Sequence, residues 1–206
     1  GSEATGQKVA ESAGIHLKKC VLELGGSNAF IVLEDADIPA AVDTGIKARF
    51  MNAGQSCIAA KRFILHKNIS DKFLRLFTDG VKKLKAGDPM LEDTDIGPLV
   101  SVSQAITVEE QVARSVAMGA KVICGGTRDG AFLKQAVITD VSPGMPLFNE
   151  EVFGPAAAVT VAEDISEAVA LANRTSFGLG VSLFTGDIDK ARELVSEFDD
   201  GAVFIN

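Results

Sequence analysis

The stretch Arg62-Phe63-Ile64-Leu65-His66, followed after three residues by Ser70-Asp71-Lys72-Phe73-Leu74, decides the fold of this chain. Its first part has a continuous apolar centre, which is typical of a strand covered on both faces. From Ser70 onward the apolar residues take helical spacing, and we expect Ser70 to cap this helix. The apolar stripe of the helix consists of Phe73, Leu74, Phe77, Val81 and Leu84. The stretch therefore predicts a buried strand followed by an amphipathic helix.

Strand-like and helix-like segments alternate along nearly the whole chain. The predicted strands cover residues 20–23, 29–33, 62–66, 121–124, 135–138, 157–161, 181–184 and 202–205. The other predicted helices begin at the capping residues Asp37, Ser101, Asp164 and Asp187. Alternation of this kind favours an α/β fold, in which a mostly parallel sheet carries helices on both faces.

The composition indicates a globular protein with a substantial core. Of the 206 residues, 47% are hydrophobic and 23% are charged, and this length suits one large domain, or one domain with part of another. The net charge of −8 argues against nucleic acid or an anionic membrane surface as a partner, because both require clustered Lys and Arg. No apolar run reaches the roughly 18 residues of a membrane span, and no secretory leader is evident.

The chain has three cysteines, Cys20, Cys57 and Cys124. An odd number of thiols without metal-ligand spacing indicates a reducing compartment and no metal site, so we expect a cytoplasmic protein. Cys20 and Cys124 lie in apolar, strand-like runs, and we expect both to be buried and unreactive. Cys57 lies in a different setting and is the candidate for chemistry.

Three motifs contain chemically useful side chains: Glu23-Leu24-Gly25-Gly26, Asn52-Ala53-Gly54-Gln55-Ser56-Cys57 and Glu151-Val152-Phe153-Gly154-Pro155. Taken alone, Cys57 is either a structural thiol or a nucleophile that Gly54 lets a substrate approach. Glu23 is either a surface carboxylate at a strand end or a general base. Glu151 and Phe153 are either a solvated loop with an apolar anchor or ligand contacts.

The three motifs, in this order, resemble those of the aldehyde dehydrogenase superfamily. The resemblance implies that Cys57 attacks an aldehyde to form a thiohemiacetal, which becomes a thioester after hydride loss. It also implies that Glu23 activates water to release a free acid, since members that pass the acyl group to coenzyme A lack this Glu. The implied cofactor is NAD or NADP, and the implied hydride acceptor is its nicotinamide ring.

The resemblance also implies which residues contact the cofactor. Gly25 and Gly26 would leave room for the nicotinamide ring, Glu151 would accept hydrogen bonds from its ribose, and Phe153 would pack beside it. Ser2, in Gly1-Ser2-Glu3-Ala4-Thr5-Gly6, fits a phosphate-binding turn at a helix start. The alternative is that Gly1-Ser2 is the remnant of a cleaved tag.

The resemblance covers the chain from Gly1 to Asn206. The strings Ala59-Ala60-Lys61-Arg62-Phe63-Ile64 and Val203-Phe204-Ile205-Asn206 are most similar to bacterial succinate-semialdehyde dehydrogenases, which makes succinate semialdehyde the candidate substrate. One departure is Met51, where several such enzymes have an Arg for the substrate carboxylate. Another is Ala59, where some relatives have a second, redox-active Cys.

By the same resemblance, residues 1–26 would be the last helix and strand of a dinucleotide-binding domain, and residues 27–206 the catalytic domain. We therefore expect a truncated chain that is inactive alone, from a parent that is a homo-oligomer. Two other functions remain open at this stage. One is a non-catalytic structural or oligomerisation module. The other is a thiol hydrolase that pairs Cys57 with His16 or His66.

Overall fold

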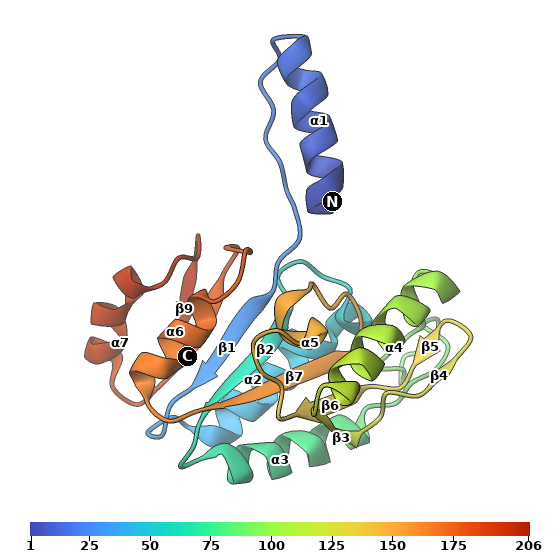
Figure 1. The fold of residues 1–206 in the computed structure, drawn as a ribbon. Helices are drawn as coiled ribbons and strands as arrows, with labels where there is room; N and C mark the ends of the chain where they lie inside the picture. The colour runs from blue at the N-terminus through green and yellow to red at the C-terminus, as the bar shows by residue number, and fades with distance from the viewer.

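The computed structural model describes all residues from 1 to 206 and is built around one seven-stranded sheet, in the order β3-β6-β7-β2-β1-β8-β9 (Figure 1). Every neighbouring pair is parallel except β3 and β6. The strands are β1 (Asn28–Val32), β2 (Ala60–His66), β3 (Lys121–Cys124), β6 (Ala136–Thr139), β7 (Ala156–Ala162), β8 (Val181–Phe184) and β9 (Val203–Ile205). A small hairpin adds β4 (Arg128–Asp129) and β5 (Phe132–Leu133).

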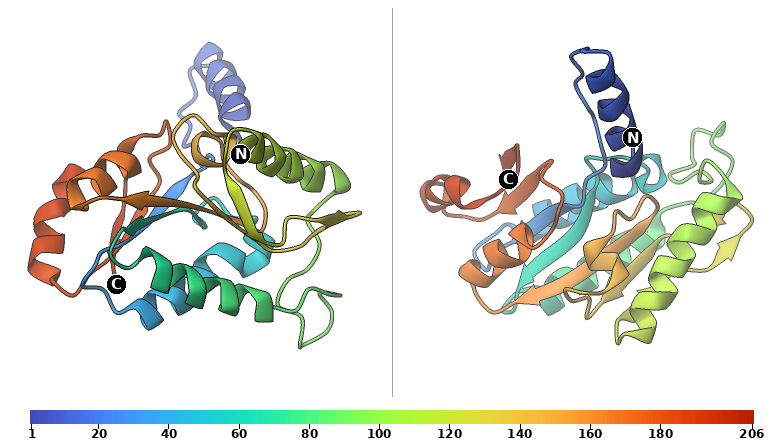
Figure 2. Two further views of the ribbon diagram at one scale, coloured as in Figure 1. Left: turned by 60° about the horizontal axis from the view of Figure 1, so that its bottom comes forward. Right: turned by 45° about the horizontal axis from the view of Figure 1, so that its top comes forward.

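Helices cover both faces of the sheet, as Figure 2 shows from two further directions. The helices that pack on the sheet are α2 (Ile38–Phe50), α3 (Ser70–Lys83), α4 (Val102–Ala117), α5 (Pro146–Asn149), α6 (Ile165–Asn173) and α7 (Ile188–Leu194), with short 3-10 turns at Met51–Gly54 and Val195–Glu197. Helix α1 (Glu3–Ile15) stands away from the sheet (Figure 1). Buried residues of α2 and α3 belong to one core cluster, and those of α4 to α7 belong to the other. The predicted α/β class and its two helical layers are confirmed. No helix is both long enough and apolar enough to cross a membrane.

Side chains of β1 and β2 alternate between the two cores. Phe30 and Phe63 pack on the side of α2 and α3, with ring centroids 5.0 Å apart. Phe63 also contacts Phe77 of α3 at 4.8 Å, while Ile31 and Ile64 enter the opposite core. Both strands are buried along their whole length, so the continuous apolar runs predicted this burial correctly.

Four predicted helix caps are confirmed, because Asp37, Ser101, Asp164 and Asp187 each accept a hydrogen bond from a backbone N–H three residues on. The predicted cap at Ser70 is wrong. Ser70 is already the first residue of α3, and its hydroxyl donates to the carbonyl of Lys67 at 3.0 Å. The side chain uses the carbonyl of the preceding turn and leaves the first N–H groups of the helix to other partners.

The predicted strand at residues 20–23 is also wrong. This segment is extended but has no sheet partner, and it stands with α1 away from the sheet (Figure 1). Cys20 is consequently exposed. The strand β3 exists as predicted, but it is an edge strand with Val122 and Ile123 nearly half exposed, and Cys124 is only half buried. An apolar run indicates an extended segment, but it does not say whether a neighbour covers it.

Arg62 joins β2 to the segment before β1 and to the end of α6. Its buried guanidinium donates to the carbonyls of Ser27, Leu171 and Ala172 at 2.8, 2.8 and 2.9 Å, and it lies 5.2 Å from the ring centroid of Phe148. Burial lowers the pKa of Arg62 to about 10, and the charge of Asp200 opposes this shift. The last carbonyls of a helix have no partner within the helix, so this cation satisfies groups that would otherwise be unpaired.

We expect Arg62→Met to lower the free energy of unfolding by about 3 kcal/mol or more, because hydrogen bonds to a charged group contribute about 1.5–3 kcal/mol each. Urea unfolding followed by circular dichroism measures the change. Lys67→Met is the matched control, since Lys67 follows the same strand at its other end and pairs with Glu163 on the surface. Equal urea midpoints for the two variants would contradict this role for Arg62.

Candidate active site

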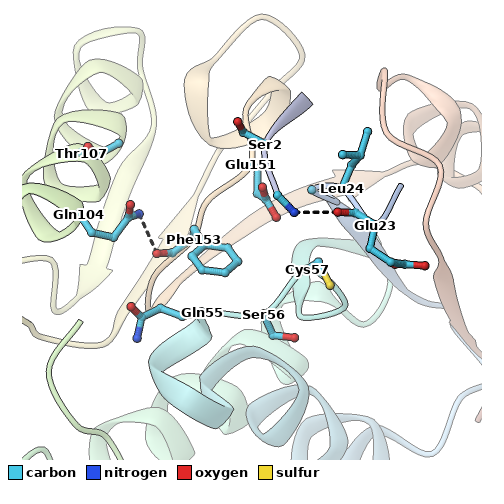
Figure 3. Close-up of a pocket in the computed structure, with 12 residues that line it drawn as sticks. Ser2, Glu23, Leu24, Gln55, Ser56, Cys57, Gln104, Thr107, Glu151 and Phe153 are labelled. Atoms are coloured by element: carbon cyan, nitrogen blue, oxygen red, sulfur yellow. Dashed lines mark hydrogen bonds between the residues drawn. The ribbon is translucent and has the colours of Figure 1, made fainter. Parts of the chain in front are cut away.

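A cleft of about 660 Å³ opens at the amino-terminal ends of the three central strands. Cys57 comes just before β2, Glu151 and Phe153 come just before β7, and Gly25 comes shortly before β1. Because β1, β2 and β7 are parallel neighbours, the loops that enter them meet at one edge of the sheet. Figure 3 shows these side chains converging from separate segments.

The structure brings the predicted site residues together. Those that line the cleft are Ser2, Glu23, Gly25, Cys57, Glu151 and Phe153. Gly26 lies behind them, and its backbone N–H donates to Glu151 Oε1 at 3.1 Å. The sequence therefore identified which residues share this site, although it did not show their contacts.

The start of the chain closes one side of the cleft. The amino group of Gly1 donates to the carbonyl of Glu23 at 2.7 Å. Ser2 caps α1, and its hydroxyl accepts from the N–H of Thr5 at 3.3 Å. Gly6 lies inside α1 rather than in a turn and packs against Leu24. The glycine-serine string is therefore a helix start whose cap is the side chain of Ser2.

The loop before Cys57 has an unusual backbone. Asn52, Ala53 and Gly54 have φ values of 53°, 52° and 73°, which lie in the left-handed region. The side chains of Asn52 and Gln55 each donate to the other residue's carbonyl. Non-glycine residues in this region cost about 1–3 kcal/mol each and are concentrated at functional sites. The strained turn presents Cys57 at the edge of the cleft.

Arg49, the buried residue near the end of α2, connects two of the site loops. Its guanidinium donates to the carbonyl of Gly54 at 3.3 Å and to that of Ala60 at 3.1 Å. It also donates to Val152 at 3.0 Å and to Gly154. Burial lowers the pKa of Arg49 to about 9, against the attraction of Glu151. One cation thus holds the Cys57 loop and the Glu151 loop together.

Lys61 lies directly beneath Cys57. Its fully buried ammonium donates to the carbonyls of Ser56 and Cys57 at 2.9 and 3.0 Å. Glu151 Oε1 is 3.6 Å away. Burial and, less strongly, the charge of Arg49 lower the pKa of Lys61 to about 8, while Glu151 and Cys57 act in the opposite direction.

The double glycine accommodates protein atoms at close range. A Cβ on Gly26 would lie 2.7 Å from the carbonyl oxygen of Cys57, and one on Gly25 would overlap the carboxylate of Glu151. These glycines allow the segment that contains Glu23 to pass against both other motifs. On the far side of the cleft, Gln104 of α4 donates to the carbonyl of Phe153 at 3.0 Å and fixes that loop.

The other two cysteines lie outside the cleft. Cys20 is exposed, which overturns the expectation that it is buried. Cys124 is half buried, and burial raises its pKa. Because the exposed thiol of Cys20 can also react with an alkylating reagent, labelling of Cys57 has to be measured separately for each cysteine. No group of three or more His, Cys, Asp or Glu side chains in the structure is arranged so that it could hold a metal ion.

Sequence reasoning missed the basic residues that hold the site, Arg49, Lys61 and Arg62. A signal for two of them was available, because Lys61 and Arg62 interrupt an otherwise apolar strand. Charged residues at such positions are almost never buried unless their donors are satisfied. Nothing in the sequence around Arg49 distinguishes it from a basic residue at an exposed helix end.

The fold and the residues around Cys57 define a class of α/β proteins with a thiol and two carboxylates at the amino ends of parallel strands. The family model described as "Aldehyde dehydrogenase family" matches residues 1–206, and the chain belongs to this family. The resemblance seen in the motifs is confirmed.

Two curated relatives that match the whole chain are both succinate-semialdehyde dehydrogenases. The chain is 47% identical to succinate-semialdehyde dehydrogenase [NADP(+)] of Mycobacterium avium strain 104, over 100% of this chain and 44% of the relative. It is 48% identical to succinate-semialdehyde dehydrogenase [NADP(+)] 1 of Mycobacterium tuberculosis strain H37Rv, over 100% of this chain and 46% of that protein. The chain thus spans less than half the length of these relatives.

Solved structures show the same fold. A structure of Gox0499 superimposes with a TM-score of 0.96 at 41% identity, over 99% of this chain and 45% of the other. Glyceraldehyde-3-phosphate dehydrogenase GapN from Methanocaldococcus jannaschii, complexed with NADP, has a TM-score of 0.94 at 37% identity, over 99% and 44%.

We expect Gly54→Ala to disrupt the site, because a Cβ there would overlap the guanidinium of Arg49 and the carbonyl of Gly154. Gly130 is the matched control, since its φ is also positive but nothing lies within 4 Å of an added Cβ. Gly130→Ala should lower the free energy of unfolding by about 1 kcal/mol, because only the positive φ is unfavourable for the added Cβ. Gly54→Ala should cost clearly more and should change the alkylation rate of Cys57. Similar losses in both variants, by urea unfolding, would show that Arg49 does not constrain this loop.

Proposed function

We propose that this chain supplies the nucleophile, the hydrolytic base and the nicotinamide-end contacts of an NAD(P)-dependent aldehyde dehydrogenase that releases a free carboxylic acid. The observation that carries the proposal is that Cys57, Glu23, Glu151 and Phe153 line one cleft. Packing alone requires neither carboxylate there, and family membership supports the same reading.

Cys57 is the nucleophile. Its sulfur attacks the aldehyde carbon and gives a thiohemiacetal, whose developing oxyanion the backbone N–H of Cys57 helps to bind. Loss of hydride from that carbon leaves a thioester on Cys57. The nucleophile needs a fixed position, because reacting atoms must approach to about 3–3.5 Å. The strained turn and its carbonyl contacts with Lys61 and Arg49 provide this.

The residues of the cleft fit a nicotinamide cofactor. Glu151 has a carboxylate that is 22% exposed, which suits the two hydroxyl donors of a ribose, and Phe153 offers an apolar ring beside Cys57. When bound, NAD or NADP supplies the hydride acceptor. Ser2 lies at the same cleft, at the amino-terminal end of α1, where a phosphate is favoured. The two mycobacterial relatives are named as NADP-dependent.

Glu23 is the base that completes turnover. Its exposed side chain lines the same cleft as Cys57, and its carboxylate points away from the Cys57 sulfur in this structure (Figure 3). The carboxylate takes a proton from water, the water oxygen attacks the thioester carbon, and the Cys57 sulfur leaves with formation of the free acid. The substrate is an aldehyde, and the names of the relatives favour succinate semialdehyde.

The proposal includes a division of the chain into parts of two domains. Residues 1–26 are the last part of a dinucleotide-binding domain, and residues 27–206 form the catalytic domain. The helix α1 and the extended segment after it stand away from the sheet (Figure 1), which supports this division. The parent protein is a cytoplasmic homo-oligomer in this proposal.

The alternatives have less support. A thiol hydrolase would need a histidine beside Cys57, but neither histidine lines the cleft. His66 ends β2 at the opposite edge of the sheet, and the His16 ring lies at the end of α1 against the carbonyl of Ser12. No observation favours a purely structural module over an enzyme.

Glu23→Gln in the full-length protein should give a burst of about one equivalent of reduced cofactor per site. Steady turnover should then fall by roughly 100-fold, because only water activation is lost. Stopped-flow absorbance of the reduced cofactor measures both phases. Cys57→Ala should abolish the burst as well. If burst and steady rate fall in the same proportion in Glu23→Gln, the assignment of the base is wrong.

The 206-residue chain alone should not reduce cofactor detectably. A dinucleotide draws much of its binding from a glycine-rich βαβ unit, and this chain provides only the contacts near Cys57. Incubation with excess NAD or NADP and succinate semialdehyde tests the expectation. Cofactor reduction that disappears in Cys57→Ala would show that these residues suffice for catalysis.

A further inference from the structure

The ammonium of Lys61 touches two parts of the site at once. It donates to the carbonyls of Ser56 and Cys57, at 2.9 and 3.0 Å, and it lies 3.6 Å from Glu151 Oε1. No other cationic group lies within ion-pair distance of Glu151. Lys61 is therefore the direct charge link between the nucleophile loop and the Glu151 loop.

Burying the ammonium of Lys61 costs free energy unless hydrogen bonds and an opposite charge compensate for the lost water. Its side chain has 0% exposure, and an ammonium removed from water needs hydrogen bonds and an opposite charge. Methionine would fill a similar volume without this cost. The strand could therefore have held an apolar residue here, as it does at the buried positions Phe63, Ile64 and Leu65.

The charged groups that face Lys61 are Arg49 and Glu151. Two cations and one carboxylate therefore meet beneath the Cys57 loop. The ammonium of Lys61 also restrains Glu151. It lies near Oε1, the same oxygen that accepts a hydrogen bond from the N–H of Gly26.

We propose that Lys61 is a positioning residue of the active site, which sets the Cys57 loop and the Glu151 carboxylate relative to each other and so holds Cys57 in its place in the cleft. The expected effect of Lys61 on turnover rests on the proposed function. The expected effect of Lys61 on the labelling of Cys57 can be measured without turnover. The lowered pKa of Lys61, about 8, agrees with a buried ammonium that its neighbours only partly compensate.

The test compares Lys61→Met, which removes charge and donors, with Lys61→Arg, which keeps both. The matched control is Lys67→Met at the other end of β2, where the lysine pairs with Glu163 outside the cleft. Each variant of the full-length protein is assayed for kcat, for the KM of NADP and of NAD, and for the iodoacetamide labelling rate of Cys57, resolved by peptide mapping.

Lys61→Met should raise the cofactor KM by about tenfold or more and slow Cys57 labelling by several-fold, because small displacements at a reacting centre have large effects. Lys61→Arg should have a cofactor KM and a Cys57 labelling rate close to those of the wild type. Lys67→Met should change neither the cofactor KM nor the labelling rate. In a double-mutant cycle with Glu151→Gln, the KM effects should be strongly non-additive, since the two residues would act through one contact.

The proposal is overturned if Lys61→Met changes the cofactor KM and Cys57 labelling less than twofold while unfolding at a lower temperature. Additive effects in the cycle with Glu151→Gln would also overturn it. If Lys61→Met does not fold, Lys61→Gln replaces it, because the amide keeps an N–H donor without the charge. A wild-type protein without Cys57-dependent cofactor reduction would refute the proposed function, and the labelling rates would still decide the role of Lys61.

Discussion

The interaction on which the site depends is the set of hydrogen bonds from the buried guanidinium of Arg49 to main-chain carbonyls. Arg is suited to this task because its planar group carries five N–H donors and keeps its charge. Here it contacts the carbonyls of Gly54, Ala60, Val152 and Gly154. These carbonyls belong to two stretches about a hundred residues apart in sequence, one that runs from the turn before Cys57 to the first residue of β2 and one that precedes β7. Without the cation, the loops would present unpaired polar groups to the core.

The same arrangement recurs twice on β2. Lys61 serves the carbonyls of the Cys57 loop, and Arg62 serves those at the end of α6 and before β1. The two cations therefore satisfy different sets of main-chain carbonyls although they are neighbours in sequence. Main-chain carbonyls replace carboxylates as the principal partners in all three cases. Desolvation lowers the pKa of each basic group, and for Lys61 the nearby Glu151 opposes this shift without cancelling it.

The location of the cleft follows from how the chain enters its strands. In open α/β sheets, ligands usually bind outside the carboxyl ends of the strands. At that end of this sheet, Asp35 accepts hydrogen bonds from Thr185 and Asp187, and these groups tie loops together. The chemically distinctive side chains all lie in segments that precede β1, β2 and β7. Left-handed residues before Cys57 make this possible, because they turn the chain sharply between α2 and β2.

The α/β class, most of the strands, four helix caps and the identity of the residues that meet in the cleft could all be predicted from the sequence. These features follow from local periodicity, capping chemistry and motifs. The predicted strand at residues 20–23 was wrong, because an apolar run does not show whether another strand lies beside it. The predicted cap at Ser70 was wrong, because a serine hydroxyl can also donate to a carbonyl that precedes it in the chain. That Arg49 and Lys61 hold the site became evident from the three-dimensional arrangement of the chain. Their partners are main-chain carbonyls, which every residue has, so no pattern of side chains marks where those carbonyls will converge.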